Sequence, residues 1–224
     1  MKKLLILGLT LALLAPAAEA RKKKGKAGKI TDNVFRDDKY GFELTIHENW
    51  KPKIGKPKEN VRLRLTQRQY GVPSDYMDAK DYTLIPQVIL YVDTTSFGAH
   101  MFIDSLTSNA YKSKQKKAIL KEFELLNEKD LIPKRRSRLE IAGESALLWR
   151  GEAKYMKEIQ ESASSISGKR VRRSYGGAIV AVKEGENIFL FHIMTELEYF
   201  ESVMQEILPT IKNLVLPGDD EDEG

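Results

Sequence analysis

Two apolar runs joined by a short turn constrain the fold of this chain more than any other feature. Residues 178–182 and 188–194 are almost wholly apolar, and the turn 184–187 between them reads Glu-Gly-Glu-Asn. Short apolar runs around a glycine-containing turn predict an antiparallel β-hairpin. Because both runs are apolar on both faces, this hairpin should lie in the middle of a sheet that other elements cover on each side.

Alternating patterns predict further strands. Apolar and polar residues alternate over 42–46 and 62–68, as they do in strands that bury one face. In the second segment the leucines fall on the buried face, which leaves Arg62 and Arg64 on the face exposed to water. Both segments should therefore lie where one side of the sheet is solvated.

Three more strands are predicted from residue 84 onward. Residues 84–92 are apolar on both faces beyond Pro86, which should stand at the start of the strand because proline cannot donate to a ladder. Residues 138–142 and 145–155 predict two strands joined at Gly143-Glu144.

Apolar residues recur at helical spacing over 99–110, 115–127 and 197–214. Thr195 and Glu198 form a capping-box sequence before the last of these helices, and Pro209 should cause a kink or a new first turn within it. The order of strands, helix, strands and helix, together with a hairpin buried on both faces, predicts an α+β fold. We expect an α/β/α sandwich with a mainly antiparallel central sheet and helices on both faces.

The chain begins with the three parts of a secretory signal peptide. Lys2 and Lys3 provide the positive start, residues 4–15 form an apolar core, and Ala18-Glu19-Ala20 supplies the small-x-small cleavage pattern. The apolar run is shorter than the roughly 20 residues that span a bilayer. We expect cleavage after Ala20 and export, either to a periplasm or out of the cell. A lipoprotein anchor requires a cysteine, and the chain has none.

The charge pattern divides the chain into four parts. We expect a signal peptide at 1–20, a basic disordered tail at 21–33, a single domain at 34–216 and an acidic disordered tail at 217–224. Six of the nine residues from 21 to 29 are basic, and all five from 219 to 223 are acidic. Charge runs with no apolar residues to bury remain disordered. The absence of cysteine also excludes disulfides, thiolate metal sites and cysteine nucleophiles.

The segment 40–46, Tyr-Gly-Phe-Glu-Leu-Thr-Ile, leads to Asn49-Trp50 and resembles the opening strand of PsbP-like and DcrB-like domains. The likeness continues through the turn at 141–146, the apolar hairpin and the closing helix, over about residues 34–216. The resemblance implies an α/β/α sandwich of the small, mostly exported and non-catalytic kind, with no catalytic residues and no cofactor to carry over. Many bacterial members resemble lipoproteins, so a cysteine-free chain fits a soluble periplasmic or secreted protein better.

The three histidines form no catalytic or metal-binding pattern. His100 and Asp104 are four residues apart on a predicted helix, but no second pair accompanies them, so we expect no metal site. His192 lies inside the apolar hairpin, where a hydrogen-bonded core histidine is the favoured interpretation and a general base is the alternative. Ser145 follows Gly143 as in a nucleophile elbow, but the closing glycine is missing, and a hairpin fits better.

Two clusters of basic residues flank predicted strands. They consist of Lys134, Arg135, Arg136 and Arg138, and of Lys169, Arg170, Arg172 and Arg173. If these strands lie at the same end of the sheet, the clusters form one positive surface that binds phosphate or sulfate groups. The alternative is two solvated loops. No aromatic residue stands among the arginines, so the pattern favours anionic lipid, envelope polysaccharide or an acidic protein over nucleic acid.

The sequence therefore predicts an exported, non-catalytic binding or accessory protein of the cell envelope or secretome. Its expected partner is a protein or an anionic envelope component, with no transmembrane segment left after cleavage. Two alternatives stay open: a small hydrolase or isomerase that uses His192, and an electrostatic adaptor whose basic tail binds an anionic membrane surface.

Overall fold

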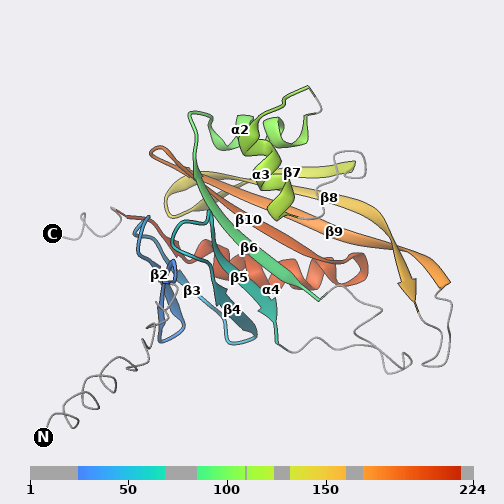
Figure 1. Cartoon of the computed structure of the whole chain (residues 1–224), viewed down its shortest axis with the longest axis horizontal. Coiled ribbons are helices and arrows are strands. Elements are labelled where there is room, and N and C mark those ends of the chain that lie inside the picture. The colour runs from blue at the N-terminus through green and yellow to red at the C-terminus, as the bar shows by residue number, and fades with distance from the viewer. Residues whose placement is uncertain (1–24, 69–84, 109, 124–131, 160–168, 218–224) are drawn as a thin grey trace, which may run out of the picture.

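A seven-stranded antiparallel sheet forms the centre of the computed structural model, which describes residues 25–68, 85–108, 110–123, 132–159 and 169–217 (Figure 1). In sheet order its strands are β4 (Trp50–Ile54), β5 (Val61–Gln67), β6 (Gln87–Thr94), β10 (Asn187–Glu196), β9 (Lys169–Glu184), β8 (Glu144–Ile159) and β7 (Ile132–Ile141). Every pairing between neighbours in this order is antiparallel. The predicted α+β class and mainly antiparallel sheet are confirmed.

The apolar hairpin forms in the predicted place. β9 and β10 pair from Glu184 opposite Asn187 to Tyr175 opposite Glu196, and Gly185 in the turn has a positive φ of 51°. β10 is the fourth of the seven strands, with three neighbours on either side. Its apolar residues are buried on both faces, which explains why this stretch carries no alternating polar residues.

The helices contribute to two separate buried clusters. α4 (Phe200–Lys212) shares one cluster with Phe189 and Phe191 of β10. α2 (Ala99–Thr107) and α3 (Lys114–Glu122) share the other cluster with Ile188 and Leu190. Successive residues of β10 thus alternate between the two clusters, as the two-residue period of a strand requires.

A second, smaller sheet packs in the same cluster as α4, and of its strands the sequence predicted only the segment 42–46. Its order is β1 (Gly28–Thr31), β2 (Val34–Asp37), β3 (Glu43–Thr45) and β11 (Leu214–Val215). Phe42 meets Phe189 of the large sheet edge to face, with ring centroids 5.4 Å apart. The small sheet therefore belongs to the same buried core as α4.

The fold begins before the expected boundary at residue 34. β1 lies within the segment expected to be a basic tail, and the turn at Asp32-Asn33, with φ of 52° and 63°, joins it to β2. Ala27 is buried and its N–H donates to the Gly55 carbonyl at 2.9 Å. The expected signal peptide, residues 21–24 of the expected basic tail and residues 218–224 of the expected acidic tail lie outside the described residues.

The start of the last helix differs from the prediction. β10 runs through Thr195 and Glu196, a 3-10 turn follows at Leu197–Tyr199, and α4 has Tyr199 as its N-cap with no side-chain capping bond. The predicted capping box is therefore wrong, because strand pairing with β9 takes Thr195 into the sheet. Pro209 lies inside α4, which continues to Lys212.

Candidate functional site

A groove of about 780 Å³ lies where the end of β4 and the turn into β5 face α3. Five cationic side chains line it, namely Lys53, Lys56, Lys58, Arg64 and Lys121, against two acidic ones, Glu59 and Glu122. The described part of the lining thus carries a net charge of +3. A concave surface with one dominant sign of charge concentrates ions of the opposite sign.

Not all of these cations are neutralised by neighbours. Lys56 forms an ion pair with Glu59, and Arg64 Nη2 donates to Glu122 Oε2 at 3.0 Å. In the described part of the chain, Lys53, Lys58 and Lys121 are exposed and have no acidic partner. The unpaired lysines carry the excess charge of the groove.

The groove wall is shaped by the segment 51–58, Lys-Pro-Lys-Ile-Gly-Lys-Pro-Lys. Lys53 stands on β4, which pairs with β5 from Trp50 opposite Gln67 to Ile54 opposite Leu63. Gly55 then turns the chain so tightly that a Cβ atom would lie 1.9 Å from the Val61 carbonyl oxygen. Only glycine fits there. The close turn places Lys56 and Lys58 on the rim, next to the strand that carries Arg64.

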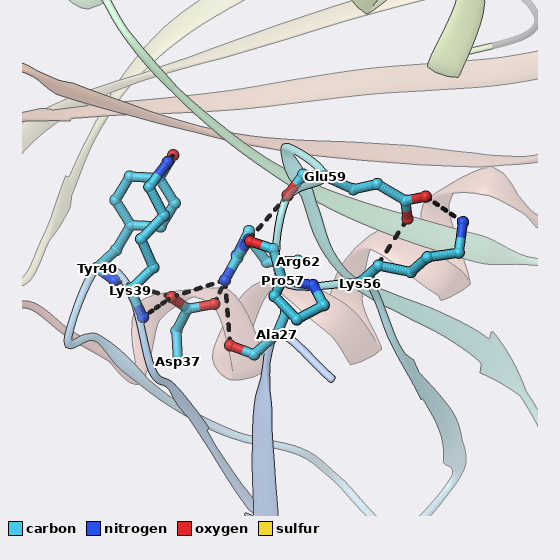
Figure 2. A network of polar contacts seen from close by, with 8 residues as sticks. All are labelled: Ala27, Asp37, Lys39, Tyr40, Lys56, Pro57, Glu59 and Arg62. Atoms are coloured by element: carbon cyan, nitrogen blue, oxygen red, sulfur yellow. Dashed lines mark hydrogen bonds and ion pairs between the residues drawn. The ribbon is translucent and has the colours of Figure 1, made fainter. Parts of the chain in front are cut away.

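Arg62 anchors this turn from inside the protein (Figure 2). Its Nη1 donates to the carbonyls of Pro57 and Glu59, at 3.1 and 2.8 Å. Its Nε lies 2.6 Å from Asp37 Oδ2, and its Nη2 reaches the Ala27 carbonyl at 3.1 Å. One guanidinium group therefore ties the turn of the groove to β2 and to Ala27, the residue just before β1.

The prediction that Arg62 faces water is wrong, since the residue is 1% exposed. A shift of register between Val61 and Leu63 interrupts the alternation of β5, so the side chain at position 62 does not share the half-exposed environment of Arg64. Burial of this cation is possible because carboxylate and carbonyl oxygens accept from all three of its nitrogens.

Tyr91 provides a neutral polar group at the wall of the groove. Its hydroxyl donates to Asp93 Oδ2 at 2.9 Å and accepts from Asn60 Nδ2 at 3.0 Å. Burial raises the pKa of Tyr91 above its ordinary value, so the hydroxyl stays protonated at neutral pH. The side of the groove nearest the core therefore offers hydrogen-bonding groups without adding charge.

The basic clusters predicted from the sequence lie on strands. β7 and β9 start at the same end of the sheet, on either side of β8, with Ile132 opposite Glu152 and Lys169 opposite Ile159. The start of β9 therefore extends seven residues further along β8, or about 23 Å at the usual rise per residue. Whether the two clusters form one surface stays a prediction, because most of their side chains lie outside the described part of the chain. Those side chains are Lys134, Arg135, Lys169, Arg170, Arg172 and Arg173.

The two described members of these clusters are Arg136 and Arg138, and both are exposed. Arg136 forms an ion pair with Asp104 of α2. Asp104 is the acidic residue four positions after His100 in the sequence, and its carboxylate is paired with Arg136. Among the described residues, no group of three or more histidine and acidic side chains could hold a metal ion.

His192 is a core residue, as predicted, but the predicted hydrogen bond is not found among the described residues. It is 2% exposed and stacks on Phe123, with ring centroids 4.6 Å apart. Its buried Nδ1 has no hydrogen-bond partner in the described part of the chain. Burial lowers the pKa of His192 to about 3, so the ring is neutral and a weak proton acceptor at neutral pH.

The segment around Ser145 forms the predicted hairpin. Ala142 and Gly143 make the turn with φ of 51° and 69°, and Ser145 pairs with Glu140 across the ladder between β7 and β8. Within the residues that the structure describes, no helix has the length and apolarity needed to cross a membrane.

The groove was missed in the sequence analysis. Its strongest local signal is the run of four lysines in the eight residues from 51 to 58, interspersed with two prolines and a glycine. Its remaining lining comes from Tyr91 and from α3, which are distant in sequence.

The fold and the groove together define an α+β protein with a cationic surface site. No protein-family model matches this sequence, and no curated protein matches it. Among solved structures, LpqN of Mycobacterium tuberculosis, described as involved in cell envelope biogenesis, is similar with a TM-score of 0.43 and 11% identity over 79% of this chain and 83% of LpqN. Cyanobacterial PsbP (CyanoP) from Synechocystis sp. PCC 6803 is similar with a TM-score of 0.43 and 10% identity over 86% of this chain and 98% of CyanoP. At these identities both likenesses concern the fold alone.

Proposed function

We propose that this protein is an exported binding or accessory protein of the cell envelope or secretome, and that it holds an anionic group of its partner in the cationic groove. The observation that carries the proposal is the set of Lys53, Lys58 and Lys121, which have no acidic partner among the described residues, around a groove whose described lining has a net charge of +3. Such a site attracts an anion by its charge and needs no group that performs covalent chemistry. The partner is a protein with an acidic segment or an anionic envelope component.

The basic residues of β7 and β9 form a second contact surface in this proposal. A continuous row of paired residues leads from Arg64 through Ile89, His192, Ile179 and Trp149 to Arg136. Five strand spacings separate the ends of this row, or about 24 Å. The groove and the basic strands can therefore contact different parts of one large anionic partner, and each can be changed without touching the other.

Three further features belong to the proposal. The chain folds as a single α/β/α sandwich domain, residues 1–20 direct export and are removed, and the mature protein is a periplasmic or secreted protein without a lipid anchor.

Lysine, with its compact and strongly hydrated charge, suits reversible attachment of the anionic partner at an exposed site such as the groove.

The test is affinity capture of the tagged mature protein from its own envelope extract. Lys53, Lys58 and Lys121 are changed together to glutamate in one variant, and Arg136 and Arg138 in a second. These residues are exposed, so both variants should fold. A partner retained by wild type at low salt, released at high salt and lost from the groove variant supports the proposal. A partner that both variants retain as well as wild type does would contradict it.

A further inference from the structure

The Glu122 carboxylate pairs with Arg64 at the C-terminal end of α3, where the helix itself disfavours a negative charge. Glu122 is the last residue of α3, and the carbonyl groups at a helix C-terminus repel an acidic side chain. Its stabilising partner is Arg64, at 3.0 Å from Nη2 to Oε2. The two side chains are 33% and 43% exposed, so this contact can be exchanged for another one.

Two nitrogens of the Arg64 guanidinium group are available to donate to a further acceptor. One hydrogen bond joins it to Glu122, and its Nε and Nη1 have no partner among the described residues. A guanidinium group can make two parallel bonds to a tetrahedral or planar oxyanion. Among the described residues of the groove lining, Arg64 is the one arginine, and the four other cations are lysines. It is therefore the residue best suited to orient a bound anion.

We propose that the groove binds a phosphate monoester on Arg64, and that the Glu122 carboxylate occupies this position until the phosphate displaces it. This inference rests on the proposed function and specifies its ligand chemistry. A carboxylate ligand would gain little binding free energy by displacing Glu122, because one carboxylate on Arg64 would only be replaced by another. A phosphate monoester carries nearly two negative charges at pH 7 and three acceptor oxygens, which suit Arg64 and the unpaired lysines together.

The size of the groove indicates a phosphorylated molecule with further groups, because about 780 Å³ far exceeds the space that one phosphate fills. A soluble sugar or glycerol phosphate and a phosphorylated lipid headgroup present the same chemistry. Asn60, with the Tyr91 hydroxyl beside it, offers hydrogen-bonding groups for the uncharged part of such a ligand.

The first measurement is calorimetric titration of the full-length chain with glycerol 3-phosphate, with succinate as a dicarboxylate control. Glycerol 3-phosphate should bind, and succinate should bind more weakly. In parallel, the protein is sedimented with phosphatidylcholine vesicles that contain or lack phosphatidic acid. Binding of the soluble probe supports a free phosphate ester as ligand, and binding confined to the phosphatidic acid vesicles supports a lipid headgroup. Absence of binding to both probes overturns the inference, as does equal affinity for succinate.

The displacement of Glu122 is tested by comparing two variants that remove one negative charge each from the same groove. Glu122→Gln should raise phosphate affinity by about 1.5- to fivefold, the range set by the strength of an exposed ion pair. Glu59→Gln should raise it less, because Glu59 pairs with Lys56 and not with Arg64. In a chain that carries Arg64→Lys, the effect of Glu122→Gln should shrink toward that of Glu59→Gln. Equal effects of the two glutamine variants in the wild-type background overturn the displacement.

These outcomes separate the inference from the proposed function. Loss of the captured partner on reversal of Lys53, Lys58 and Lys121, combined with no binding of either phosphate probe, leaves the proposed function standing and shows the phosphate assignment to be wrong. Phosphate binding that survives the triple reversal contradicts both.

Discussion

Arg62 and Asp37 face each other inside the protein, with 2.6 Å between Nε and Oδ2 and side chains that are 1% and 0% exposed. Asp37 belongs to β2 of the small sheet and Arg62 to β5 of the large one. The pair thus joins two sheets that share no strand. Asp37 also accepts from the backbone N–H groups of Lys39 and Tyr40, so its carboxylate is hydrogen bonded on both sides (Figure 2).

Replacing Asp37 by alanine should destabilise the protein by about 3–5 kcal/mol, because Arg62 would remain buried without a counter-charge. The measurement is urea unfolding followed by tryptophan fluorescence. Asp104→Ala serves as the matched control, since Asp104 pairs with Arg136 at the surface and the two side chains are 55% and 41% exposed. Its cost should not exceed about 1 kcal/mol. Similar losses in the two variants would show that the buried pair contributes no more than a surface pair.

Gly176 and Gly177 are adjacent on β9 but meet different surroundings. A Cβ atom on Gly176 would lie 2.3 Å from Cγ of Phe200, whose ring packs on the strand from α4. A Cβ atom on Gly177 would have its nearest neighbour, the Ile193 carbonyl oxygen, at 4.0 Å. The strand therefore approaches the Phe200 ring closely at Gly176 but not at Gly177.

Gly176→Ala should therefore destabilise the protein by about 1–3 kcal/mol through overpacking against Phe200. Gly177→Ala should be neutral or stabilising by up to about 1 kcal/mol, since alanine reduces the freedom of the unfolded chain. Thermal unfolding of both variants under one set of conditions gives the comparison. An equal loss in both would mean that general disturbance of the strand, and not contact with Phe200, sets the cost.

The regular elements could be predicted because their signals are local. A period of two identified 42–46 and 62–68, and uninterrupted apolar runs identified the central hairpin. The small sheet was only partly predicted, because β1 and β2 have four residues each and β11 has two, too few for a period to emerge. Those strands exist because distant segments pair, which the pattern of one segment does not reveal.

The same reasoning explains the errors at the site. Alternation assigned Arg62 to the solvent, and a local shift of register, together with an acidic partner 25 residues earlier in the chain, placed it in the interior. The groove combines residues 53–64, Tyr91 and the end of α3. Only the lysine run was visible in sequence, and it lies on the opposite edge of the large sheet from the predicted basic strands.

His192 should make folding stability depend on pH in a defined window. Burial lowers its pKa in the folded protein from the ordinary 6.5 to about 3, so between these values the unfolded chain binds the extra proton. Stability from this residue is therefore complete above about pH 6.5 and is lost as the pH falls toward 3. The slope contributed by one such group reaches at most about 1.4 kcal/mol per pH unit.

The check is to measure the free energy of unfolding of wild type, His192→Leu and His47→Gln between about pH 5 and pH 7. Carboxylates contribute least to the pH dependence in this range. His192→Leu should flatten the slope, because leucine keeps the apolar packing on Phe123 and removes the titrating group. It also removes the buried Nδ1, which has no partner among the described residues. His47→Gln, which removes an exposed histidine, serves as the control. A slope that persists in His192→Leu would assign the pH dependence to other groups, and the stacked ring would then be protonated without loss of the fold.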